Sequence, residues 1–199
     1  MSEKRLIVGV TGASGSVYAR KFLDAISDRF DKVYLIVSEN AESVIRLELG
    51  DSSDESLDAV TLLQANRSNI QVCRPGDLFA PPSSGSVHTE GMVIIPCSMG
   101  TVGRIAAGIS NDLITRAADV CLKERRPLIL VPREAPLSLI HLRNLTSLAE
   151  AGATILPASP AFYHQPQSID DLVSFVIARV MQQLGLEQDL APEWKGIEE

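Results

Sequence analysis

A short apolar run bounded by prolines, Leu128 to Val131, limits the fold of this chain more than any other stretch. The run is rich in β-branched residues, so it indicates a buried strand of a parallel sheet. Arg133 and Glu134 follow it almost directly. Because open α/β sheets bind ligands beyond the carboxyl ends of their strands, these two side chains are expected in a ligand crevice. A surface ion pair on a loop is the alternative.

Similar apolar runs recur along the chain and predict further strands at residues 6–10, 33–37, 70–73, 92–95 and 154–157. Helical spacing of apolar residues between the runs predicts helices at about 17–26, 40–49, 57–65, 101–121 (with a break near Gly108), 137–151 and 169–184. This alternation predicts one doubly wound α/β domain over residues 1–199. Its flavodoxin- or Rossmann-like parallel sheet should have about six strands, with helices on both faces.

Composition excludes several classes of protein. A formal net charge of −7 argues against nucleic acid as a partner, because phosphate backbones require a basic face. No apolar run is long enough to span a membrane, and no signal peptide precedes the first strand, so a cytoplasmic protein is expected. The three cysteines show no CxxC spacing, which favours buried free thiols. The three histidines lack metal-ligand spacing, and we predict no metal.

Two strand ends carry glycine and hydroxyl residues in front of a helix. The first is the turn at residues 11–15, TGASG, where a helix N-terminus could bind a phosphate. The GxGxxG fingerprint is absent, which favours a mononucleotide over a dinucleotide. Ser14 could instead be only an N-cap. The second is Cys97–Thr101, another anion cradle, in which Cys97 is expected to pack rather than react.

Several charged or aromatic residues outside these turns could bind a phosphate. Arg116 and Lys123 are seven residues apart and therefore share one face of a helix, and together with Arg133 they would form a phosphate pocket. Each could equally be a solvated surface residue. Tyr163 lies in a loop after the last strand, where it could pack through its ring or offer its hydroxyl. Glu48 lies near a helix end, where a solvated carboxylate is the default.

Two segments have no obvious place in a single α/β core. The loop at residues 74–91 is rich in Pro, Ser and Gly, which indicates a lid, an interaction segment or disorder. The acidic tail from about residue 185 contains Trp194, the single tryptophan of the chain. Such a tail is expected to pack on the body or on a neighbouring subunit.

Long motifs in the chain resemble the flavin prenyltransferases of the UbiX type. They are TGASG at 11–15, PCSMGT at 96–101, NDLITRAADV at 111–120, KERRPLILVPREAP at 123–136 and FYHQPQS at 162–168. The likeness covers nearly the whole chain and is weakest at residues 50–67. It implies a metal-independent transferase that joins a dimethylallyl group, from dimethylallyl phosphate or pyrophosphate, to N5 and C6 of reduced FMN.

The resemblance also implies partners. The product, prenylated FMN, would pass to a UbiD-type decarboxylase, in ubiquinone synthesis or in aromatic-acid decarboxylation. The family assembles as a dodecamer with active sites at subunit interfaces. The same assembly would explain why one acidic chain carries so many cations for one pocket.

Residue roles follow from the same resemblance. Glu134 matches the proton-transfer glutamate, Ser14 lies near the reacting flavin edge, and Glu48 matches a further carboxylate that lines the site. The implied FMN contacts are Gly12, Ala13, Ser14, Ser38, Ser98, Met99, Gly100, Thr101 and Arg133. The implied contacts to the donor phosphate are Arg116, Lys123, Tyr163 and Arg179.

Two other functions are compatible with a flavin-binding fold. One is an FMN-dependent decarboxylase of the peptidyl-cysteine type, in which a histidine performs acid–base chemistry. The first glycine turn and its helix contain no histidine, however, and the cations would then have no purpose. The other is a non-catalytic FMN carrier, in which Glu134 and the cations would be dispensable.

Overall fold

The structure, a computed structural model, describes residues 3–50, 58–193 and 196. Within these residues one sheet has six strands in the order β3-β2-β1-β4-β5-β6, and every neighbouring pair is parallel. The strands are β1 (Arg5–Val10), β2 (Lys32–Val37), β3 (Ile70–Cys73), β4 (Met92–Cys97), β5 (Leu128–Pro132) and β6 (Thr154–Ile155). The doubly wound parallel sheet predicted from the sequence is confirmed.

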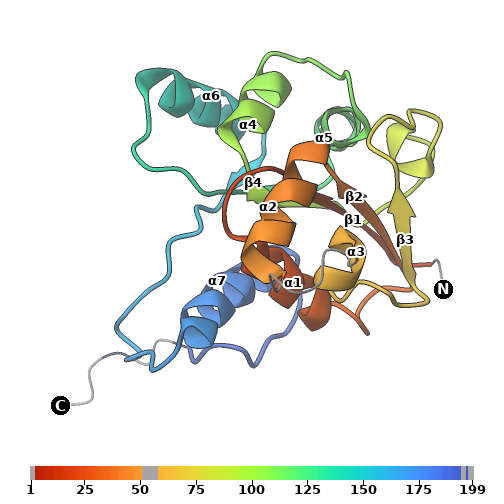
Figure 1. Cartoon of the computed structure of the whole chain (residues 1–199). Helices are drawn as coiled ribbons and strands as arrows, with labels where there is room; N and C mark the ends of the chain where they lie inside the picture. The colour runs from red at the N-terminus through yellow and green to blue at the C-terminus, as the bar shows by residue number, and fades with distance from the viewer. Residues whose placement is uncertain (1–2, 51–57, 194–195, 197–199) are drawn as a thin grey trace.

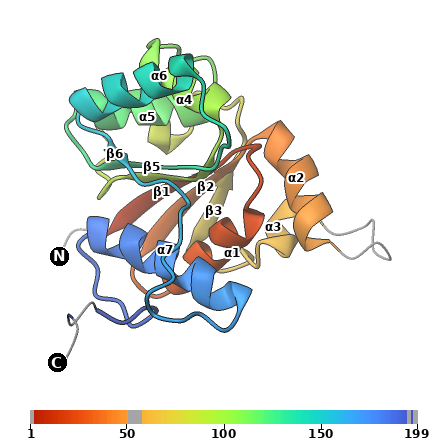
Figure 2. The ribbon, with the colours of Figure 1, turned by 90° about the vertical axis from the view of Figure 1, so that its left-hand side faces the viewer.

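Helices cover both faces of this sheet, as Figures 1 and 2 show. On one face lie α1 (Ser16–Ala25), α2 (Glu39–Leu49), α3 (Ala59–Leu62) and α7 (Ile169–Gln183). On the other lie α4 (Met99–Ala106), α5 (Leu113–Lys123) and α6 (Leu139–Glu150). Alternate residues of β1 supply the two cores: Leu6 and Val8 pack under the first face and Ile7 under the second. Burial on both sides explains why the strands are continuously apolar.

The helix boundaries differ from the sequence prediction in a few places. The segment after β4 forms two helices, α4 and α5, and the expected break at Gly108 is confirmed by its φ of 69°. The N-cap of α1 is Gly15, with no side-chain cap, so the interpretation of Ser14 as an N-cap is wrong. The strand expected at 154–157 ends at Ile155. Part of the helix expected at 57–65 lies outside the described residues.

The long loop at residues 74–91 packs against α5 of its own chain. Arg126 donates hydrogen bonds from its guanidinium to Val87 O at 2.7 Å and to Gly85 O at 2.6 Å. Arg116 Nε donates to Ser83 O, in the short 3₁₀ helix η1 (Pro81–Ser83), at 3.0 Å. Two arginines of the same chain therefore hold this loop in place, which argues against disorder, and its role as a lid or an interaction segment stays a prediction.

The described part of the tail also contacts its own chain. Leu186 and Leu190 pack against the core cluster that contains α7. Trp194 lies outside the described residues, so its packing on a neighbouring subunit stays a prediction. Within the described residues, no helix has the length and apolar character needed to cross a membrane.

All three cysteines are free and buried, as the sequence predicts. Burial raises the pKa of the Cys97 thiol to about 12, and the nearby Arg104 lowers it only partly. A thiol that is protonated at neutral pH is a poor nucleophile, which agrees with the packing role expected for Cys97.

One buried hydroxyl links the two central strands where the winding of the sheet reverses. Thr11, just beyond β1, donates from Oγ1 to Pro96 O at 2.9 Å and accepts from Ser98 N at 2.7 Å. Its backbone N–H also donates to Pro96 O at 3.2 Å. Because β1 and β4 are neighbours whose helices leave toward opposite faces, this bridge fixes the geometry of the switch point.

Replacing Thr11 by Val should lower the free energy of unfolding by about 1–3 kcal/mol, because Ser98 N–H would lose its buried acceptor. Urea unfolding followed by circular dichroism measures this. Thr11→Ser, which keeps the hydroxyl, is the control, and its free energy of unfolding should fall clearly less than that of Thr11→Val. Equal stability of Thr11→Val and wild type would show that the bridge contributes nothing.

Candidate active site

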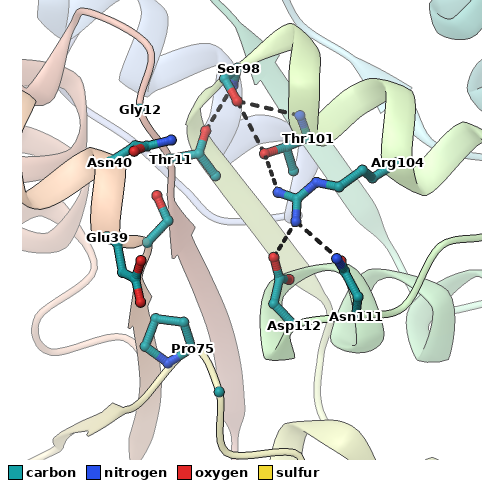
Figure 3. A pocket seen from close by; sticks show the side chains of 12 residues that line it. Thr11, Gly12, Glu39, Asn40, Pro75, Ser98, Thr101, Arg104, Asn111 and Asp112 are labelled. Carbon is teal, nitrogen blue, oxygen red and sulfur yellow. Dashed lines mark hydrogen bonds and ion pairs between the residues drawn. The ribbon is translucent and has the colours of Figure 1, made fainter.

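A cavity of about 450 Å³ opens at the carboxyl ends of β1, β2 and β4, beside the switch point (Figure 3). Its volume is within the range of about 300–1,000 Å³ typical of small-molecule sites. The lining is predominantly polar and comes from the segments after four strands. It comprises Thr11, Gly12, Ser38, Glu39, Asn40, Pro75, Gly76, Ser98, Thr101, Arg104, Asn111 and Asp112.

Two helices begin at this cavity, each directly after a strand. Ser38 caps α2 and accepts a hydrogen bond from Ala41 N at 3.2 Å. Ser98 caps α4 and accepts from Thr101 N at 3.4 Å, while its hydroxyl is 3.1 Å from Thr101 Oγ1. The first backbone N–H groups of each helix have no intrahelical partner, and the helix dipole adds positive potential there. The cavity is thus suited to an anion.

The predicted flavin contacts Gly12, Ser38, Ser98 and Thr101 all line this cavity. Gly12 is required by the close approach of two segments, since a Cβ at this position would lie 2.8 Å from Asn40 Cβ. Volume, polar lining and converging helix N-termini together fit a mononucleotide such as FMN. The sequence prediction of a mononucleotide rather than a dinucleotide agrees with this geometry.

The other predicted flavin contacts do not line this cavity. Ala13 and Met99 are buried. Gly100 is exposed at the start of α4. Arg133 Nε donates to Ser14 O at 3.0 Å, which brings the loop after β5 against the turn after β1. Arg133 and Ser14 therefore meet, as expected for two residues of one site.

The candidate proton-transfer residue Glu134 is exposed in this single chain. Its Oε1 accepts a hydrogen bond from Ala135 N at 3.1 Å. It follows Arg133 beyond the carboxyl end of β5, the edge of the sheet that also carries the cavity. Neither Arg133 nor Glu134 lines the cavity, so the crevice predicted for this pair stays a prediction.

Glu48 is exposed, but its carboxylate is bound to the first turn of α1. Its carboxylate accepts hydrogen bonds from Gly15 N at 3.0 and 3.1 Å and from Ser16 N at 2.7 Å. Partial burial opposes its ionisation, but the hydrogen bonds from Ser14, Ser16 and Gly15 outweigh burial and lower its pKa. The prediction that this helix N-terminus binds a phosphate is corrected, because a carboxylate of the same chain already satisfies it.

The predicted donor contacts Arg116 and Lys123 do not join Arg133 within one chain. Arg116 is bound to Ser83 O and to Asp119 Oδ2, at 3.0 and 2.9 Å, and Lys123 pairs with Glu124. Lys123 ends α5 at the amino edge of the sheet, whereas Arg133 follows the carboxyl end of β5. Five residues at about 3.3 Å each separate these edges by about 16 Å. The pocket of three cations in one chain is therefore wrong.

Tyr163 and Arg179 do lie together, at a separate cavity of about 130 Å³. Tyr163 packs edge-on against Phe175, with ring centroids 6.0 Å apart. Arg179 donates to Gln182 Oε1 at 2.6 Å. None of the residues that line this small cavity lines the large one, so the predicted donor contacts fall into two groups in one chain.

Known proteins identify the family. The family model described as Flavoprotein matches residues 1–181. A flavin prenyltransferase UbiX of Pseudomonas aeruginosa is 46% identical over 196 residues, covering 96% of this chain and 94% of the relative. The chain belongs to the UbiX family of flavin prenyltransferases.

Solved structures of UbiX relatives have the same fold over nearly the whole chain. AnUbiX (PadA1), in complex with FMN and dimethylallyl pyrophosphate, gives a TM-score of 0.88 at 38% identity, covering 99% of this chain and all of that one. A dodecameric FMN-dependent UbiX-like decarboxylase from Escherichia coli O157:H7 gives a TM-score of 0.86 at 42% identity, covering 96% of this chain and 100% of that one. The peptidyl-cysteine decarboxylase EpiD gives 0.59 at 16% over 92% of this chain and 99% of EpiD, which shows a shared fold alone.

Some residues at the cavity of this UbiX chain were not identified from its sequence. Asn40 and Arg104 lie inside helices, and Asn111 and Asp112 precede one, so none belongs to a strand-end motif. Asn40 had a usable signal, because it lies two residues after Ser38 at the end of a predicted strand; the other three lie six or more residues beyond Ser98 and had none. Among the residues that the structure describes, no group of three His, Cys, Asp or Glu side chains could hold a metal ion.

The cap on α1 predicts a pH dependence. The folded pKa of Glu48 is below its unfolded value of about 4.3, so its stabilisation is complete above that pH and is lost as pH falls through the folded pKa. Glu48→Gln should therefore be less stable than wild type at pH 7 by about 1 kcal/mol, the usual cost of a lost cap. The difference should shrink as the pH falls through the folded pKa of Glu48.

Urea unfolding between pH 3 and 7 measures this difference. Glu187→Gln, which removes the same charge from an exposed position in the tail, is the control and should show no such step. A constant difference between Glu48→Gln and wild type at all pH values would mean that the carboxylate charge is not what holds α1.

Proposed function

We propose that this chain joins the dimethylallyl group of dimethylallyl phosphate or pyrophosphate to N5 and C6 of reduced FMN. The observation that carries the proposal is the polar cavity at the switch point, together with the contact of Arg133 with Ser14, two residues after the cavity residue Gly12. Reduced FMN supplies the two ring atoms that accept the prenyl group. The residues of the chain hold it, exclude water and move a proton.

The cavity would hold FMN through main-chain and hydroxyl groups. Gly12, Ser38, Ser98 and Thr101 line it, and the starts of α2 and α4 offer N–H donors to the phosphate. Ala13, Met99 and Gly100 would contribute backbone, and Arg133 would contact the flavin beside Ser14. Glu48 would act indirectly, by fixing the turn that contains Ser14.

Glu134 is the residue proposed to accept the proton released when the ring closes at C6. A carboxylate beside the flavin is suited to this step, and acid–base groups typically contribute about 10²–10⁴-fold. Departure of the phosphate from the allyl carbon needs positive charge and hydrogen-bond donors. Arg116, Lys123, Tyr163 and Arg179 would supply them, and with enough donors no metal is required.

One chain keeps these donors in separate places, which supports a site shared between subunits. The E. coli O157:H7 relative is dodecameric, and we propose a homo-oligomer of the same kind here. Large exposed apolar side chains agree with buried interfaces: Phe79 is fully exposed, and Ile140 and Phe162 are 68% and 69% exposed. The product would be delivered to a UbiD-type decarboxylase.

The proposed function is tested by incubating the reduced, FMN-loaded protein with dimethylallyl phosphate, or with the pyrophosphate, in the presence of EDTA. The mass of the released flavin is then measured by mass spectrometry. We expect FMN enlarged by one dimethylallyl group. The matched control, Glu134→Gln, should bind FMN but form the product at least about 10²-fold more slowly. Unmodified FMN from wild type with either donor would refute the transferase, and a need for Mg²⁺ would refute metal independence.

The shared site predicts complementation between two inactive variants. Glu134→Gln and Lys123→Ala would be mixed in equal amounts, dissociated and reassembled. If the two residues serve one site from different chains, about one quarter of sites regain both, and activity should recover to about that fraction. The control pair, Glu134→Gln with Ser14→Ala, lies on one side of one chain and should recover nothing. Failure of the first pair, in oligomers shown to be mixed, would contradict the shared site.

A further inference from the structure

Arg104 reaches the cavity from the far end of α4. Its Cα is in the last turn, yet its Nη2 is 3.3 Å from Oγ1 of Thr101 in the first turn. Long helical side chains point toward the helix N-terminus, so this reach is natural. Gly100, one turn earlier on the same face, has no side chain, and nothing lies within 4 Å of the place its Cβ would take. The path of the arginine is therefore clear.

The guanidinium is held in one orientation at the cavity wall. Nη1 contacts Asp112 in a short ion pair and Asn111 Oδ1 at 3.3 Å (Figure 3). Asp112 is itself fixed, because its Oδ1 accepts from Thr115 N at 2.8 Å as the cap of α5. Partial burial opposes the ionisation of Asp112, but bonds from Thr115 and Arg104 keep its pKa low. Nε–H has no acceptor among the described residues, which leaves donor capacity on this side chain.

The guanidinium places positive charge beside the N-terminus of α4, which carries positive potential of its own. Asp112 balances part of this charge in the empty protein. An anion bound by the Ser98 and Thr101 segment would interact favourably with both the helix N-terminus and the guanidinium. Within the described lining, Arg104 is also the one cationic side chain, facing the carboxylates of Glu39 and Asp112. Without it, a dianionic ligand would meet only negative side-chain charge.

From these observations we infer that Arg104 binds the phosphate of FMN and makes the site select the mononucleotide over riboflavin. The inference rests on the proposed function and adds a residue that the recognised motifs do not contain. A guanidinium suits this task because its planar donors match phosphate oxygens. Asp112 acts as a positioning residue that orients the guanidinium, so that its free N–H donors face the ligand.

The test measures FMN and riboflavin binding to wild type, Arg104→Gln, Arg104→Lys and Arg29→Gln by flavin fluorescence. Arg29, exposed at the amino edge of the sheet, is the charge-matched control. We expect Arg104→Gln to lower the affinity for FMN about 10- to 100-fold and the affinity for riboflavin less than about twofold. Arg104→Lys should bind FMN with intermediate affinity, because it keeps the positive charge and loses the planar set of guanidinium donors. Arg29→Gln should match wild type.

A pH series supplies a second readout that a purely structural arginine would not change. A phosphate monoester gains its second charge near pH 6, so wild type should bind FMN more tightly above that pH. In Arg104→Gln this rise in FMN affinity near pH 6 should be smaller. Glu39 and Asp112 are present in both proteins, so the difference between the two pH profiles reports the guanidinium alone.

Several outcomes would overturn the inference. Equal loss of FMN and riboflavin affinity would make Arg104 a structural residue, and unchanged FMN affinity would exclude it from the phosphate site. Unchanged FMN affinity with a raised KM for dimethylallyl phosphate would assign it to the donor. If wild type bound no FMN at all, the proposed function itself would fail, which is distinct from a failure seen only in the variant.

Discussion

The hydroxyl of Thr11 ties together the two strands between which the chain reverses its winding, and the site depends on that bridge. β1 and β4 are adjacent, but their following helices cover opposite faces, so the loops that leave them diverge and open a crevice. Thr11 holds Ser98 N–H and Pro96 O across this divide. The start of α4 is thereby fixed relative to Gly12, and Gly12 in turn lies against Asn40 of α2. One buried side chain thus sets the spacing of both helix N-termini at the cavity.

An acidic chain that binds an anion must concentrate its positive potential, and here it does so with few full charges. The N-termini of α2 and α4 are left for a ligand, whereas that of α1 is neutralised by Glu48 from the same chain. Under the proposed function, this division would send the phosphate of FMN to one side of the crevice and leave Ser14 and Arg133 for the uncharged ring. The polarity of the site therefore follows from which helix ends are already satisfied.

Sequence patterns predicted what depends on local chemistry and missed what depends on how the elements are placed. Apolar runs located all six strands, and helical spacing of apolar residues located most of the helices, because burial patterns act within a few residues. Helical spacing also put Arg116 and Lys123 on one helix, α5. It could not show that α5 carries Lys123 to the amino edge of the sheet, away from Arg133. Arg104 was missed because its guanidinium acts a full turn before its own Cα.

The separation of the cations is itself informative about how such a site is completed. A crossover helix returns the chain to the amino edge, so residues at its end cannot meet residues at the carboxyl edge of the next strand. Only another copy can bring Lys123 to Glu134. Symmetric assembly does so at every interface at once, and each interface would also cover exposed apolar side chains such as Phe79. If the site is shared as proposed, the flavin half belongs to the single chain and the donor half forms only in the oligomer.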